Sequence, residues 1–166
     1  MTMIEKTYPI TEKLIFNALQ SAQQLLQELN HEADALKKSQ QVELINNIAS
    51  NKKQLAAQLE QFNSHLAQVL STEQLPNSQE GIKEYFRRAE TANLPSAELI
   101  GNWTQLMLVC AECRNMNEQN GAGIDLLSRH TKRSLDILKG KPEFANTYGS
   151  DGSAQSERYS HTLISV

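Results

Sequence analysis

NEQNGAGIDLL, residues 117–127, is the stretch that decides the fold of this chain. An Asn-Gly pair followed by a second glycine two residues later is typical of a turn. The flanking sequences LMLVCAEC (106–113) and LLSRHTKRSLDIL (126–138) instead have the composition of helices. The chain therefore either turns near residue 120 or continues through it as one long helix.

The spacing of the residues around this stretch favours the continuous helix. It alternates between four and three residues over forty positions, and the phase does not slip at the glycines. A turn would have no reason to preserve that phase, so we predict one helix from about 96 to about 139, roughly 65 Å long, with a possible kink at Gly121. The residues in this register are Leu99, Trp103, Leu106, Cys110, Cys113, Asn117, Asn120, Ile124, Leu127, Thr131, Ser134 and Leu138.

The glycines inside this predicted helix need a compensating interaction. Each should cost about 1 kcal/mol relative to alanine. We expect the close approach of a neighbouring backbone at Gly121 to offset that cost. Asn117 and Asn120 share the same register, where a buried amide fixes the alignment of packed helices. Trp103, the only tryptophan, is interpreted as a core anchor, with a partner surface as the alternative.

The four prolines divide the rest of the chain into long stretches without helix breakers. Thr11 is a plausible N-cap for a first helix that reaches a break or kink near 37–39, with one continuous helix through these residues as the alternative. A second helix then carries an apolar register up to Val69, which Lys52 interrupts. Breaks at 71–81 and 91–96 flank a short third helix. Its predicted buried face consists of Ile82, Tyr85, Phe86 and Ala89.

The composition of the chain is typical of proteins that are built from long amphipathic helices. Of the 166 residues, 39% are hydrophobic and only 5% aromatic, which suits helices that bury one stripe each. We therefore predict an all-α fold: an elongated antiparallel bundle of three long helices plus one short helix. The bundle domain should span 1–139, and 140–166 should form a flexible C-terminal tail, because this segment holds three of the seven glycines and has no helical period. Its last apolar residues, Tyr159, Leu163, Ile164 and Val166, are expected to lie outside the core.

Charge and hydropathy exclude two classes of partner. The net charge is -3 and there is no basic patch, so nucleic acid is not an expected partner. No apolar run approaches the ~20 residues of a membrane span, so membrane insertion is not expected either. Two cysteines and an N-terminus without a signal-peptide pattern predict a cytoplasmic location.

Catalytic and metal-binding patterns are not found. Cys110 and Cys113 form a Cys-x-x-Cys in mid-helix, whereas a redox pair normally opens a helix, and a metal site would need further ligands. Small residues buried at a helix interface are the better interpretation. His130 lacks the surroundings of a phosphotransfer histidine, and no Ser/His/Asp set is present. We predict no enzymatic activity, no cofactor and no metal.

Motifs in the last third of the chain resemble those of the FlgN-type flagellar export chaperones. They are Trp103, the Asn-x-x-Asn-Gly of residues 117–121, the Leu-x-x-Leu of 135–138 and the Tyr-Gly-x-Asp-Gly of 148–152. The resemblance covers about residues 99–152, and the chain departs from the family pattern at Ala122-Gly123, where a bulkier apolar pair is common. It implies a cytosolic chaperone for the hook-filament junction proteins, in bacterial flagellum assembly by type III secretion.

The resemblance further implies that partners bind the C-terminal third. They would be the C-terminal helices of hook-filament junction proteins, whose premature assembly is prevented, and components of the export gate and the export ATPase complex. Tyr148, in a turn-forming segment, is interpreted as an anchor for the gate or the client. The candidate partner-binding residues are Asn120, Gly121, Ile124, Leu127, Leu135, Leu138, Tyr148, Leu163 and Ile164.

Two other functions stay open at this point. One is a structural coiled-coil adaptor without a secretion client, and the other is a redox or phosphotransfer enzyme. A homodimer is also possible, because heptads serve seams within one chain and between chains equally well.

Overall fold

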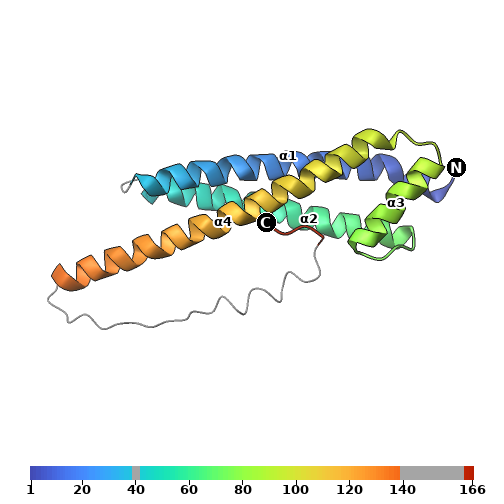
Figure 1. Ribbon diagram of the computed structural model, residues 1–166. Helices are drawn as coiled ribbons and strands as arrows, with labels where there is room; N and C mark the ends of the chain where they lie inside the picture. The colour runs from blue at the N-terminus through green and yellow to red at the C-terminus, as the bar shows by residue number, and fades with distance from the viewer. Residues whose placement is uncertain (39–41, 139–162) are drawn as a thin grey trace.

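The computed structural model describes residues 1–38, 42–138 and 163–166, and over these residues the chain forms four helices and no strand. This confirms the predicted all-α fold of three long helices and one short helix (Figure 1). The predicted flexibility of the tail concerns residues that, up to 162, lie outside the described part. The helices are α1 (Met3–Lys37), α2 (Val42–Thr72), α3 (Gln79–Thr91) and α4 (Ser96–Leu138).

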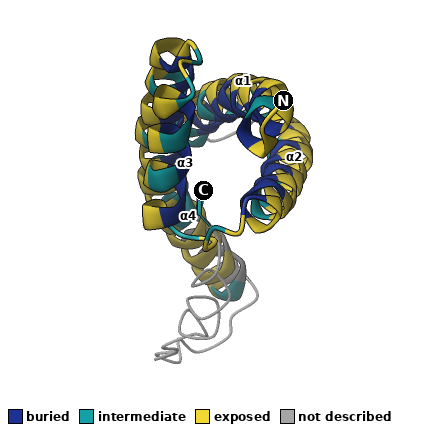
Figure 2. Cartoon of the chain, turned by 90° about the vertical axis from the view of Figure 1, so that its right-hand side faces the viewer, coloured by how far each residue is buried: buried dark blue, intermediate teal, exposed yellow. Residues whose placement is uncertain are grey.

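The consecutive long helices are antiparallel, so that α1 and α4 run in the same direction (Figure 1). The Tyr8 hydroxyl of α1 donates to the carbonyl of Pro95, just before α4 begins. Farther along, Asn120 of α4 donates to the carbonyl of Leu29. Buried residues line the faces that the helices turn toward one another (Figure 2). Among the helices that the structure describes, none combines the length and the apolar composition of a membrane span.

The predicted breaks coincide with the helix ends. α1 ends at Lys37 and α2 begins at Val42, with 39–41 outside the described residues. The two later breaks, 71–81 and 91–96, fall where α2 gives way to α3 and where α3 gives way to α4. The predicted buried face of α3 is also confirmed: Ile82, Tyr85, Phe86 and Ala89 are all buried.

The first helix begins earlier than predicted. α1 begins at Met3 and contains Pro9, so the expected start at Thr11 is wrong. Glu5, at the third helical position, accepts a hydrogen bond from the backbone N–H of Thr2 (2.5 Å), which satisfies a donor at the helix start. A proline inside a helix costs about 3 kcal/mol, and tertiary contacts of this end of α1 must therefore offset that cost.

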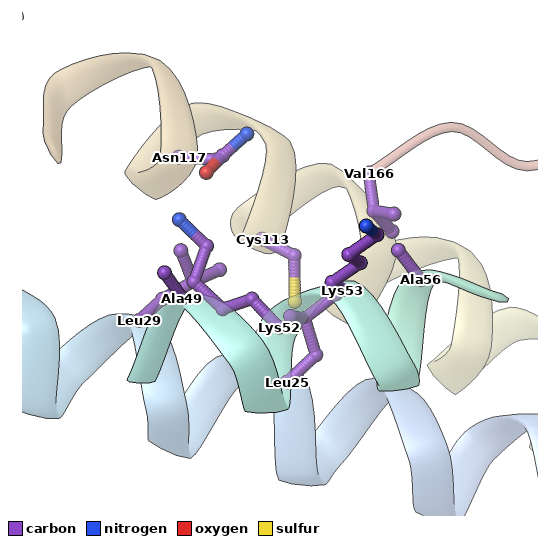
Figure 3. A pocket seen from close by; sticks show the side chains of 9 residues that line it. All are labelled: Leu25, Leu29, Ala49, Lys52, Lys53, Ala56, Cys113, Asn117 and Val166. Carbon is purple, nitrogen blue, oxygen red and sulfur yellow. The ribbon is translucent and has the colours of Figure 1, made fainter. Parts of the chain in front are cut away.

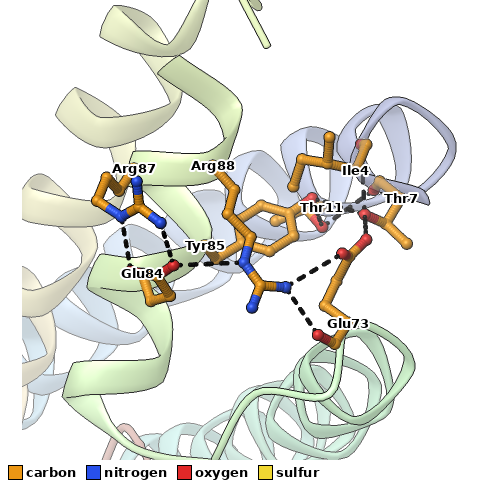
Figure 4. Close-up of polar contacts among 8 residues, drawn as sticks. All are labelled: Ile4, Thr7, Thr11, Glu73, Glu84, Tyr85, Arg87 and Arg88. Atoms are coloured by element: carbon orange, nitrogen blue, oxygen red, sulfur yellow. Dashed lines mark hydrogen bonds and ion pairs between the residues drawn. The ribbon is translucent and has the colours of Figure 1, made fainter. Parts of the chain in front are cut away.

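Those contacts are a buried polar network between α1, α3 and the α2–α3 connection (Figure 4). Thr7 donates to the Glu73 carboxylate (2.7 Å), and the Tyr85 hydroxyl donates to the Thr11 hydroxyl (3.0 Å). Burial raises the pKa of Tyr85 above its ordinary value, so its hydroxyl stays protonated and able to donate. Arg88 of α3 closes the network by donating to the Glu73 carbonyl (2.8 Å). These hydrogen bonds hold the start of α1 against α3 and the α2–α3 connection.

Residues 117–127 are helical throughout, so the prediction of one helix from about 96 to about 139 is confirmed. The predicted reason for its glycines is wrong. A Cβ added at Gly121 would meet no atom within 4 Å, and one at Gly123 would lie 3.6 Å from Leu36 Cδ1, an ordinary contact. Among the described residues, no neighbouring backbone comes within 4 Å of a Cβ built at either position. In the described part of the chain, no close backbone contact offsets the cost of placing glycine at these two positions of α4.

Gly121→Ala is therefore expected to stabilise the protein by about 1 kcal/mol, because alanine is the better helix former and the position is open. Thermal unfolding followed by circular dichroism measures this. A lower melting temperature than that of the wild type would contradict the open geometry at this position.

The end of the chain also differs from expectation. Ile164 is only 5% exposed and belongs to the core, and Leu163 and Val166 pack against it. The prediction that these residues lie outside the core is wrong. The prediction failed because these residues have no helical periodicity. They are nevertheless apolar, and they pack against a surface that the helices leave uncovered.

Candidate functional site

The three long helices enclose a groove. α1 packs along both α2 and α4, whereas in the described part of the chain no Cα atom of α2 comes within 8 Å of one of α4. α1 therefore forms the floor of a groove whose walls are α2 and α4. A cavity of about 330 Å³ marks this groove (Figure 3). It is lined by Leu25, Leu29, Ala49, Lys52, Lys53, Ala56, Cys113, Asn117 and Val166.

A buried polar cluster of Glu32, Lys52 and Asn120 joins the three helices at one end of this groove. Glu32 is only 1% exposed, and its carboxylate accepts from the Lys52 ammonium (2.9 Å) and from the Asn120 amide (3.0 Å). The same amide donates to the Leu29 carbonyl (2.9 Å). Each charge is thus paired, as burial requires. The prediction of a buried amide between packed helices is confirmed for Asn120, whereas Asn117 is only half-buried.

Beyond this polar cluster α4 leaves the core. Of the residues from Gly121 to Ile137 whose side chains are described, none is buried. α1 ends eight residues after Leu29, but α4 continues eighteen residues after Asn120, so that α4 projects by roughly 15 Å. Figure 1 shows this part of α4 diverging from α1 and α2.

The projecting part carries exposed apolar side chains, which we call the distal α4 surface: Ile124 (38% exposed), Leu126 (59%) and Ile137 (63%). Leu126 and Ile137 are eleven residues apart, three helical turns, and share one face. Ile124 instead continues the register of Asn117 and lies toward the groove. The distal α4 surface thus exposes apolar side chains on two sides of the helix.

The structure places the predicted partner-binding residues in two groups. Asn120, Gly121 and Ile124 lie where α4 leaves the bundle. Leu163 and Ile164 lie on the bundle, where Ile164 is buried. Tyr148 and the side chains at positions 127, 135 and 138 are outside the described residues.

Sequence reasoning missed three residues of this region. Glu32 and Lys52 are charged residues on the buried faces of α1 and α2. Two opposite charges on the facing sides of adjacent antiparallel helices could have indicated a buried ion pair. Asn63 of α2, which holds the end of the chain, gave no signal in the sequence.

Cys110 and Cys113 are both buried, and the Cys113 thiol donates to the Ala22 carbonyl (3.5 Å). Burial raises the pKa of Cys110 to about 12 and that of Cys113 to about 11, so both remain thiols at neutral pH. Since the thiolate is the reactive form, they serve as small packing residues. Among the described residues, no group of three or more His, Cys, Asp or Glu could hold a metal ion.

Comparison with known proteins identifies the family. A family model described as FlgN protein matches residues 11–156. The chain belongs to the FlgN family. Searches of the curated proteins and of the solved structures found no match.

Membership makes this FlgN protein a flagellar export chaperone, which binds flagellar substrate proteins. The FlgN family is a chaperone family and is not known as enzymatic. The matched residues include both the groove and the projecting part of α4, but they end before Leu163.

Proposed function

We propose that this FlgN protein binds hook-associated proteins, those of the hook-filament junction, in the cytoplasm. It prevents their premature assembly and delivers them to the export gate. The distal α4 surface carries this proposal, because α4 exposes apolar side chains on two faces where no other described element covers them. Apolar side chains that project beyond the bundle in this way are available for contact with a partner.

The client segment that fits this surface is an amphipathic terminal helix. A helix docks through apolar residues at i, i+3, i+4 and i+7, which an exposed helix with apolar side chains can receive. Covering the client's apolar face in this way would hide the surface by which it assembles.

Tyr148 and the Leu-x-x-Leu of 135–138 are proposed to take part in delivery or client contact. Tyr148 is flanked by turn-forming residues, which favour the outward presentation of its ring. Its partner would be the cytosolic part of the export gate or the client, with the export ATPase complex as a further partner. Tyr148→Ala should then reduce secretion of the client without changing the fold.

Ile137→Ser tests the client-binding proposal directly. Burying an isoleucine side chain against a partner is worth about 1.5–3 kcal/mol, so we expect the affinity for a purified hook-filament junction protein to fall at least ten-fold. Isothermal titration calorimetry measures it, and Leu126→Ser should have a similar effect.

Leu108→Ser is the matched control, because Leu108 is also 63% exposed on α4 but lies beside the bundle rather than beyond it. It should bind the client like the wild type. Equal losses in both variants, or client binding that survives Ile137→Ser, would remove the distal α4 surface as the site. If the wild type binds no hook-filament junction protein, the structural adaptor is favoured.

A further inference from the structure

The last four residues of the chain lie in the groove between α2 and α4. Figure 2, which looks along the bundle, shows the C-terminus between these helices. Ile164 is buried in the core cluster, and Leu163 and Val166 pack against it. The Asn63 amide of α2 donates to the Ile164 carbonyl (3.2 Å). A non-helical apolar segment thus occupies a place where a bundle would accept another helix.

This segment fills the groove incompletely. The cavity of about 330 Å³ begins at Val166 and continues over Cys113 and Asn117 of α4 (Figure 3). Ile124 of the distal α4 surface lies seven residues, or two turns, after Asn117 on the same face. The unfilled part of the groove therefore runs from the end of the chain to the polar cluster, and the distal α4 surface lies just beyond that cluster.

Asn63 gives independent evidence that the resident segment leaves part of the groove's hydrogen-bonding capacity unused. Its Nδ2 donates to the segment, but its Oδ1 is buried and has no hydrogen-bond partner among the described residues. An asparagine amide can pair with both a carbonyl and an N–H of an extended peptide. The chain's own segment satisfies only the first, and a buried acceptor left unsatisfied costs free energy.

We propose that the groove between α2 and α4 is part of the client-docking surface and that Leu163–Val166 is its resident occupant, which a client segment must displace. This rests on the proposed function. The chemistry of the resident segment, Leu-Ile-Ser-Val, indicates that the displacing segment is apolar. Occupation of the groove lowers the apparent client affinity, which equals the intrinsic affinity multiplied by the fraction of molecules in which the groove is open.

The docking itself is tested without a client. We compare amide NMR spectra of the full chain with those of a chain that ends at Thr162. The Asn63 side-chain signals and the backbone signals around Cys113 should shift on truncation, and the peptide SHTLISV, residues 160–166, should shift them back. The same peptide with serine at the positions of Leu163 and Ile164 should not. Unchanged signals on truncation, or equal effects of both peptides, would overturn the proposal.

The competition is tested with the purified hook-filament junction protein. The truncated chain should bind it at least five-fold more tightly than the full chain. Leu163→Ser combined with Ile164→Ser should reproduce the gain in the full-length chain, and Ser165→Ala should not. Equal client affinities would overturn the displacement step alone. Failure of every form to bind the client, with the peptide shifts intact, would instead overturn the proposed function.

Discussion

Replacing Trp103 by alanine is expected to lower the free energy of unfolding by about 3–5 kcal/mol, the usual cost of deleting a buried large aromatic side chain. Trp103 is 6% exposed, and its ring packs edge to face against the Phe86 ring, with the two ring centroids 6.3 Å apart. That contact fastens α3 onto the first turns of α4. For a chain of this length the loss corresponds to a fall in melting temperature of roughly 10 °C.

Calorimetry and circular dichroism measure this change, since the variant has no tryptophan for fluorescence. Trp103→Phe, which keeps an aromatic ring, should lose much less. Leu108→Ala, an exposed position one turn further along α4, should stay within about 0.5 kcal/mol of the wild type. If Trp103→Ala melts like the wild type but binds the client weakly, the partner-surface interpretation of Trp103 replaces the core interpretation.

The helices could be predicted from the sequence because their signals are local. The phase from Leu99 to Leu138 depends only on which residues share a face of one helix, and it predicted that α4 continues through Gly121 and Gly123. Pro76 and Pro95 lie in connections, where proline is expected. Pro9 misled the prediction of the first helix start, because the contacts that offset it come from residues 73 and 85, far away in the sequence.

The groove could not be predicted, because it depends on how far apart two helices lie. A heptad register shows that α2 and α4 each have an apolar face, but not that both turn it toward α1. The same limit applies to Gly121, because the sequence of one helix does not show whether another element approaches it. The docking of Ile164 joins residues about a hundred positions apart and has no periodic signal. The motifs thus predicted a candidate site on α4, while its position relative to the bundle depends on contacts between residues that are distant in the sequence.

Lys52→Met is expected to destabilise the protein by about 3 kcal/mol, because it leaves the buried Glu32 carboxylate without its cation. Lys52 is 21% exposed, and Asn120 still donates to the carboxylate, which places the loss at the lower end of values for broken buried pairs. Urea denaturation followed by circular dichroism measures it. Lys53→Met, at the adjacent exposed lysine, should change stability by less than about 0.5 kcal/mol.

We expect the polar cluster to position α4 as well as to balance charge, and a double variant separates these two roles. Glu32→Leu combined with Lys52→Met removes both charges and should be more stable than Lys52→Met alone, since an apolar pair replaces an ion pair at little cost. Asn120 then keeps only its bond to the Leu29 carbonyl. Because Asn120 is the last residue of α4 found buried before the helix projects, weaker alignment there should reduce client affinity even where stability is recovered. A double variant with wild-type client binding would show that the polar cluster stabilises the bundle without positioning the distal α4 surface.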